Sequence, residues 1–106
     1  MANPHRGEVS FKTPDAEYTL ILSTNALCEL EDETGKSLPS IMRDIERVTT
    51  VRALLWALLR TKQPDISLSQ AGEIIDRAGM AKTTEAIMRA ISAAQPKAAK
   101  GGTANP

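Results

Sequence analysis

The chain has 106 residues, with 13 Lys or Arg, 13 Asp or Glu and one His, so its formal net charge is zero. Its 42% hydrophobic and 25% charged residues are typical of a soluble globular protein and exclude a fully disordered chain. No apolar run approaches the roughly 20 residues of a membrane span, and the single cysteine, Cys28, excludes an internal disulfide. Length and composition therefore favour one small domain in a reducing compartment, and they name no function.

The first part of the chain predicts a β-hairpin after a loose arm at residues 1–6. Val9 and Phe11 alternate with polar residues, and residues 18–22 alternate in the same way. The turn-forming residues 13–16 separate the two runs, which is typical of two antiparallel strands. Because an isolated hairpin is marginally stable in water, we expect helices to cover its apolar face.

The chain from Ser23 onward has helical periodicity interrupted by caps and stop signals. Ser23 or Thr24 can cap a first helix that ends before Gly35, and Ser67 can cap a fourth that ends before Gly79. The expected helices are 24–34; a short one after Ser37 carrying Leu38, Ile41, Met42, Ile45 and Val48; 51–62, opened by Thr49 or Thr50; 68–78; and 81–94.

The apolar positions of these helices predict a common core. On the third helix Val51, Leu54, Leu55, Leu58 and Leu59 form one continuous face, and on the fifth Thr84, Ile87, Met88 and Ile91 are expected to point inward. The predicted fold is α+β, with an N-terminal two-stranded hairpin packed on a small bundle of four to five helices. Residues 7–94 form the single predicted domain, and the low-complexity residues 95–106 are predicted to be a disordered tail.

The sequence offers little catalytic or metal-binding chemistry. His5 is the only histidine and lies in the predicted arm, so the chain has no nucleophile–base pair and no soft metal site. The string from Thr34 to Ser37 lacks the upstream glycine of a phosphate-binding loop, because Leu30 occupies that position. We therefore predict a protein that is not an enzyme and that has no catalytic residues, cofactor or metal.

Acidic and basic residues are concentrated in different parts of the chain, and this distribution indicates what kind of partner the protein can bind. Residues 1–35 carry a net charge of −5 and residues 36–62 a net charge of +4. Within the acidic part, Glu29, Asp32 and Glu33 share one face of the first helix. This face is either solvated or meets a basic partner. A bipolar chain favours contact with protein surfaces over contact with a nucleic acid.

Trp56 lies outside the core face of the third helix, between Arg52 and Arg60 at i−4 and i+4. An Arg–Trp–Arg stripe is enriched in the energetic centres of protein interfaces. The alternative interpretation is that Trp56 contacts the hairpin or another helix, because a small bundle can bury both sides of its central helix. The candidate partner-binding residues are Trp56, Arg52, Arg60, Glu29, Asp32 and Glu33.

Several segments together resemble a known family. They are His5-Arg6-Gly7-Glu8-Val9, Tyr18-Thr19-Leu20, the block from Thr24 to Glu31 followed by Gly35, the block from Leu68 to Ile75, and Ala78-Gly79-Met80. Over roughly residues 5–93 the chain resembles the small tail-morphogenesis protein of gene transfer agents and long-tailed phages. Members of this family carry the label tail tube protein, and their small size and place in tail operons resemble tail assembly chaperones.

The resemblance implies a non-catalytic protein that binds the tape-measure protein during tail assembly. The first alternative is a structural tail tube or joining component of a phage-like particle, and a homo-oligomer stays open. The second is a small helix-turn-helix regulator, with Lys82 and Arg89 on its reading helix but Glu85 at an expected apolar position. The expected partners are tape-measure or other tail proteins and no membrane. The expected location is the bacterial cytoplasm or the virion.

Overall fold

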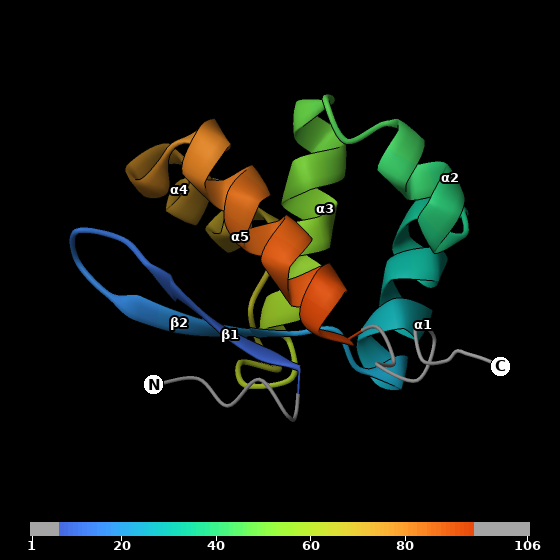
Figure 1. Ribbon diagram of the computed structural model, residues 1–106, viewed down its shortest axis with the longest axis horizontal. Helices are drawn as coiled ribbons and strands as arrows, with labels where there is room; N and C mark the ends of the chain where they lie inside the picture. Colours follow the sequence, from blue (N-terminus) through green and yellow to red (C-terminus); the bar gives the residue numbers. More distant parts are fainter. Residues whose placement is uncertain (1–6, 95–106) are drawn as a thin grey trace, which may run out of the picture.

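The structure, a computed structural model, describes residues 7–94, so the arm and the tail predicted at residues 1–6 and 95–106 lie outside the described residues. The described chain starts with an antiparallel pair of strands and continues with helices. The elements are β1 (Glu8–Lys12), β2 (Glu17–Ile21), α1 (Thr24–Thr34), α2 (Leu38–Arg43), α3 (Val48–Leu59), α4 (Leu68–Ala78) and α5 (Met80–Ala94). A two-stranded hairpin followed by five helices confirms the predicted α+β class (Figure 1).

The hairpin presents one apolar face to the helices. Its register pairs Val9 with Leu20 and Phe11 with Tyr18, so these four side chains lie on the same face. Helix α5 packs on β1, and α3 packs on β2. Val9, Phe11 and Leu20 are buried in consequence. The helices therefore cover the hairpin face, as its marginal stability in isolation requires.

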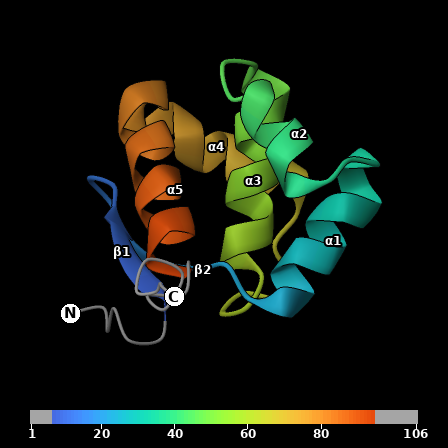
Figure 2. The same cartoon turned by 45° about the vertical axis from the view of Figure 1, so that its right-hand side comes forward.

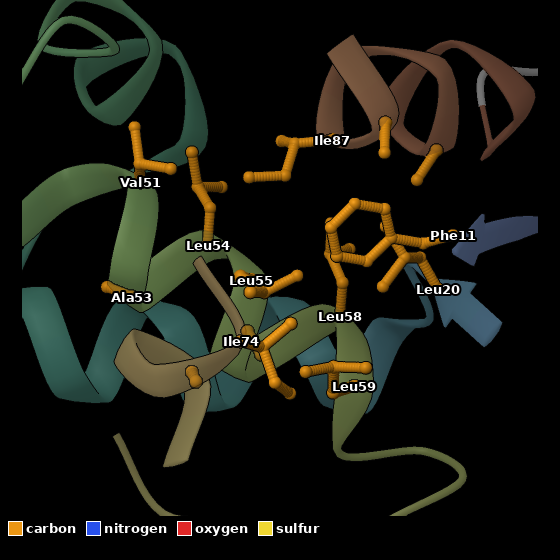
Figure 3. Packing of buried hydrophobic residues seen from close by; sticks show 14 of the residues in the cluster. Phe11, Leu20, Val51, Ala53, Leu54, Leu55, Leu58, Leu59, Ile74 and Ile87 are labelled. Carbon is orange, nitrogen blue, oxygen red and sulfur yellow. The ribbon is translucent and has the colours of Figure 1, made fainter. Parts of the chain in front are cut away.

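Helix α3 is the centre of the molecule. It contacts α1, α4, α5 and β2, and Figure 2 shows it standing between α5 on one side and α1 on the other. In Figure 3, Leu58 of α3 lies beside Phe11 and Leu20 of the strands, with Ile87 of α5 nearby. The face predicted for this helix is confirmed, because its five positions, Val51, Leu54, Leu55, Leu58 and Leu59, are all buried.

The boundary between the second and third helices differs from the prediction. Helix α2 ends at Arg43, and two successive turns lead into α3, which already begins at Val48. Ile45 is thus in a turn, and Val48, expected on the second helix, is 61% exposed at the start of the third. The apolar spacing continued past Arg43, but tertiary packing turns the chain there to bring α3 into the core. Helix α3 also ends earlier than predicted, at Leu59.

The buried face of α5 is rotated from the predicted one. Thr83 is buried in place of Thr84, and Met88 is 44% exposed. The buried face includes Ala86 and Ala90, whose small side chains allow α5 to approach the sheet and α3 closely. The Thr83 hydroxyl donates to the Gly79 carbonyl at 2.8 Å, so its burial leaves no unsatisfied hydroxyl proton. The inward positions expected for Thr84 and Met88 were therefore wrong, whereas those of Ile87 and Ile91 are confirmed.

Candidate partner-binding site

Trp56 lies on the side of α3 that faces the connection to α4. Its indole is half-buried and packs against the core cluster. The indole Nε1–H donates to the carbonyl oxygen of Ile66 at 3.1 Å, which satisfies the only hydrogen-bonding group of this side chain. Ile66 is itself buried. Trp56 therefore fixes the connection between α3 and α4 to the central helix.

Arg60 covers Trp56 and joins it to α1. The guanidinium carbon lies 5.1 Å from the centroid of the indole ring, a cation–π distance. The same guanidinium donates to both carboxylate oxygens of Glu29, one of these bonds being 3.2 Å long, and to the Pro64 carbonyl at 2.7 Å. The hydrogen bonds to Glu29 raise the pKa of Arg60. Trp56, Arg60 and Glu29 thus form one cluster, called here the indole cluster, between α1, α3 and the following loop.

The other predicted site residues lie apart from the indole cluster. Arg52, one turn before Trp56 on α3, faces a hollow that Glu33 of α1 also lines. Asp32 is exposed and makes no ion pair with another described residue. The structure therefore brings together three of the six predicted residues in the indole cluster and two in the hollow, and it leaves Asp32 on the surface.

The hollow lies at the N-terminal end of α3 and has a volume of about 280 Å³. Most of its polar lining residues were not predicted from the sequence as site residues. The net positive charge of residues 36–62 was the sequence feature that could have pointed to them. Lys36 donates to Asp44 at 2.9 Å across its rim, and this bond lowers the pKa of the Asp44 carboxyl. The polar or charged residues around the hollow, called here the α3 hollow, are Glu33, Thr34, Lys36, Asp44, Arg47, Thr49, Thr50 and Arg52.

The described part of the chain has neither a metal-binding cluster nor a helix that could span a membrane. Within residues 7–94, no three His, Cys, Asp or Glu side chains lie close enough together to bind a metal ion. None of the helices in that range combines the length and the apolar character needed to cross a bilayer.

The chain matches one known protein family over most of its length. Residues 6–95, most of its length, match the family described as "Phage tail tube protein, GTA-gp10". The chain belongs to this family. No curated protein and no solved structure is significantly similar to it.

Membership of the GTA-gp10 tail tube family agrees with the resemblance over roughly residues 5–93, and it makes the chain a phage-tail-related protein. The matched range includes the whole described structure, from the hairpin to α5. Both the indole cluster and the α3 hollow thus lie inside the part of the chain that matches the family.

Proposed function

We propose that this member of the GTA-gp10 tail tube family is a non-catalytic tail assembly chaperone that binds the tape-measure protein. The observation that carries the proposal is the size of the sheet. Within residues 7–94 it has two strands of five residues each, and its apolar face is already covered by α3 and α5. A subunit that closes a ring by strand pairing needs a larger sheet. A small helical body suits a reversible binding protein better.

The surface of the protein supports binding to another protein. Acidic side chains are exposed on α1, and three cations of residues 36–62, Lys36, Arg47 and Arg52, line the α3 hollow. Charge separation of this kind orients a protein partner and speeds its association. We propose that the partner contacts the indole cluster, the α3 hollow and the exposed Asp32, and so uses the six residues Trp56, Arg52, Arg60, Glu29, Asp32 and Glu33.

The indole cluster adds an anchor of the type found in interfaces. Trp and Arg are the residues most enriched among the energetically dominant contacts of protein complexes. Trp56 is half-buried in the free protein and Arg60 covers its ring, so a partner would extend an arrangement that is already ordered. Preorganisation of this kind lowers the entropy cost of binding.

A structural component of the tail tube is the second candidate, and the family description favours it directly. In that role the protein would self-associate and remain in the particle, whereas a chaperone would act in the bacterial cytoplasm and leave before the tail is complete. The two roles therefore predict different oligomeric states and different contents of the finished particle.

Co-expression with a tape-measure protein separates the two candidates. If the protein is a chaperone, the tape-measure protein becomes soluble, co-purifies with the chain, and the chain is absent from purified particles. Size-exclusion chromatography with light scattering measures the complex, and mass spectrometry measures the particle content. Rings or tubes formed by the chain alone, together with many copies per particle, would contradict the chaperone proposal and support the tube subunit.

A further inference from the structure

Arg52, a cation of the α3 hollow, has one nitrogen without an acceptor among residues 7–94. The Nε of Arg52 is buried, and it makes no hydrogen bond within the described part of the chain. The aliphatic stem of Arg52 passes close to α4, where a Cβ at Gly72 would lie 3.4 Å from Arg52 Cδ. A buried donor without an acceptor destabilises a fold, so its retention needs a reason.

The surroundings of Arg52 are also rich in free donors. None of the three ion pairs in residues 7–94 involves Arg52 or Arg47. Thr49 and Thr50 line the same hollow, and Arg47, the residue before α3, makes no side-chain cap to the first backbone N–H groups of the helix. These N–H groups carry the positive end of the helix dipole. Guanidinium and hydroxyl donors thus line the α3 hollow near the start of the helix, and one of the two carboxylates of the lining, Asp44, is bound by Lys36.

We propose that the α3 hollow binds an acidic side chain, Glu or Asp, presented by a segment of the protein partner. The proposal deepens and rests on the proposed function, because it names the chemistry by which the tape-measure segment would be recognised. The carboxylate would accept from Arg52 and from the first turn of α3, in the charge-assisted geometry that makes Arg the preferred partner of carboxylates.

The charge and the size of the hollow favour a carboxylate over a nucleic acid. Lys36, Arg47 and Arg52 carry three positive charges, and Glu33 and Asp44 carry two negative charges, so the lining has a net charge of +1. One carboxylate neutralises this charge, whereas the dense negative charge of a phosphate backbone would be repelled by the two acids. A volume of about 280 Å³ is also at the small end of ligand sites and suits a side chain.

The test uses the full chain and defined probes. A short peptide of alternating glutamate and alanine is titrated into the 15N-labelled protein at low salt, with its lysine–alanine counterpart and oligothymidylate as comparisons. We expect saturable shifts of the Thr49 and Thr50 amides and of Arg52 Nε with the acidic peptide, weakened by added salt. Absence of these shifts, or tighter binding of oligothymidylate at the same groups, would overturn the proposal.

Two variants separate binding from folding. Arg52→Met keeps the aliphatic stem over Gly72 and removes the guanidinium. We expect the affinity for the acidic peptide to fall by about tenfold or more, because one charge-assisted hydrogen bond is lost. Its melting temperature should be unchanged or higher, because a buried unpaired donor is removed. Arg89→Met changes an exposed arginine of α5 outside the hollow and should bind like the parent. Unchanged peptide binding by Arg52→Met contradicts the proposal.

The same variants separate this inference from the proposed function. One outcome is that the parent does not bind the acidic peptide, while Arg52→Met still co-purifies with the tape-measure protein as the parent does. This outcome would overturn the inference and leave the chaperone role intact. Specific acidic-peptide binding by a parent that does not bind the tape-measure protein would support the inference and count against the chaperone role.

Discussion

Trp56 combines two kinds of contact in one side chain. Its ring is half-buried against the core and covered by Arg60, and its N–H holds the Ile66 carbonyl at 3.1 Å. The first contact is apolar and tolerates another aromatic ring, whereas the second depends on the indole nitrogen. The two contributions can therefore be separated by substitution, and so can stability and partner binding.

We expect Trp56→Phe to lower the free energy of unfolding by about 1 kcal/mol, the usual value of one hydrogen bond, because the Ile66 carbonyl loses its donor. Trp56→Ala should cost more, since it also removes the apolar ring. Urea unfolding followed by circular dichroism measures both. If Trp56→Phe and Trp56→Ala both unfold like the parent, Trp56 does not fix the loop.

Leu58 tests the core of the central helix. It is fully buried beside Phe11 and Leu20, so Leu58→Ala leaves a cavity and should destabilise the protein by about 2–5 kcal/mol. Met88→Ala is a suitable control on a different helix, because Met88 is 44% exposed and its truncation should have a much smaller effect. Thermal unfolding that is equally affected in the two variants would contradict this assignment of the core.

At the scale of the elements, the ends of the helices follow local rules. Ser23 accepts from the backbone N–H of Ala26 at 3.1 Å, and Ser67 forms a capping box with Gln70. Helix α1 ends at Thr34, and the following Gly35 has a φ of 71° and donates its backbone N–H to the Glu31 carbonyl at 2.7 Å. These caps and this stop signal fix both ends of α1 and the start of α4 through contacts within a few residues.

Gly35 is a test of this local control. A Cβ at Gly35 would meet nothing within 4 Å, so the cost of Gly35→Ala arises from the left-handed backbone alone. We expect a loss of about 1 kcal/mol for Gly35→Ala and a smaller loss for Gly35→Asn, since Asn tolerates this conformation better. Chemical denaturation measures the difference. A larger loss for Asn than for Ala would show that backbone strain is not the cause.

Local rules explain why the type and order of every element could be predicted from the sequence. Where a boundary or a face depended on packing, the prediction was less accurate. Val48 continued an apolar spacing yet opens the next helix, and α5 buries Thr83 and the small residue Ala86 in preference to Met88. A prediction from hydrophobic periodicity gives weight to large apolar residues, whereas closely packed helices bury small residues where they meet.

The candidate site was less predictable than the fold. Trp56 and Arg60 could be paired from their spacing on one helix, but Glu29 is 31 residues from Arg60 along the chain. The hydrogen bond of Trp56 goes to a backbone carbonyl in a loop, where the residue type carries no signal. Contacts that join distant segments through backbone atoms require the three-dimensional structure.

At the scale of the whole molecule, two hydrogen-bonded carboxylates couple stability to pH. The Ser10 hydroxyl lowers the pKa of Glu17, and the Lys36 ammonium lowers that of Asp44. The unfolded chain therefore binds protons more readily than the folded one, and stability falls as the pH drops through the folded-state pKa values. We expect a declining melting temperature below about pH 4.5, the ordinary pKa of a glutamate.

The pH dependence can be assigned to these groups by substitution. Glu17→Gln and Asp44→Asn should each flatten the acid decline, as measured by thermal unfolding between neutral and acidic pH. Asp32→Asn is the control, because Asp32 is exposed and makes no ion pair within residues 7–94. A decline that is equally steep in the parent and in both variants would assign it to other groups.

The position of α5 on the hairpin has a consequence for how the protein is made. The strands lie near the start of the chain, their cover α5 is the last described helix, and a Cβ at Gly7 would lie only 3.5 Å from Ala94 Cα. During synthesis the strands therefore leave the ribosome long before α5 does. Until α5 emerges, their apolar face lacks one of the two helices, α3 and α5, that pack on it. Contacts so far apart in sequence slow folding. The uncovered strands are also open to premature association in the nascent chain.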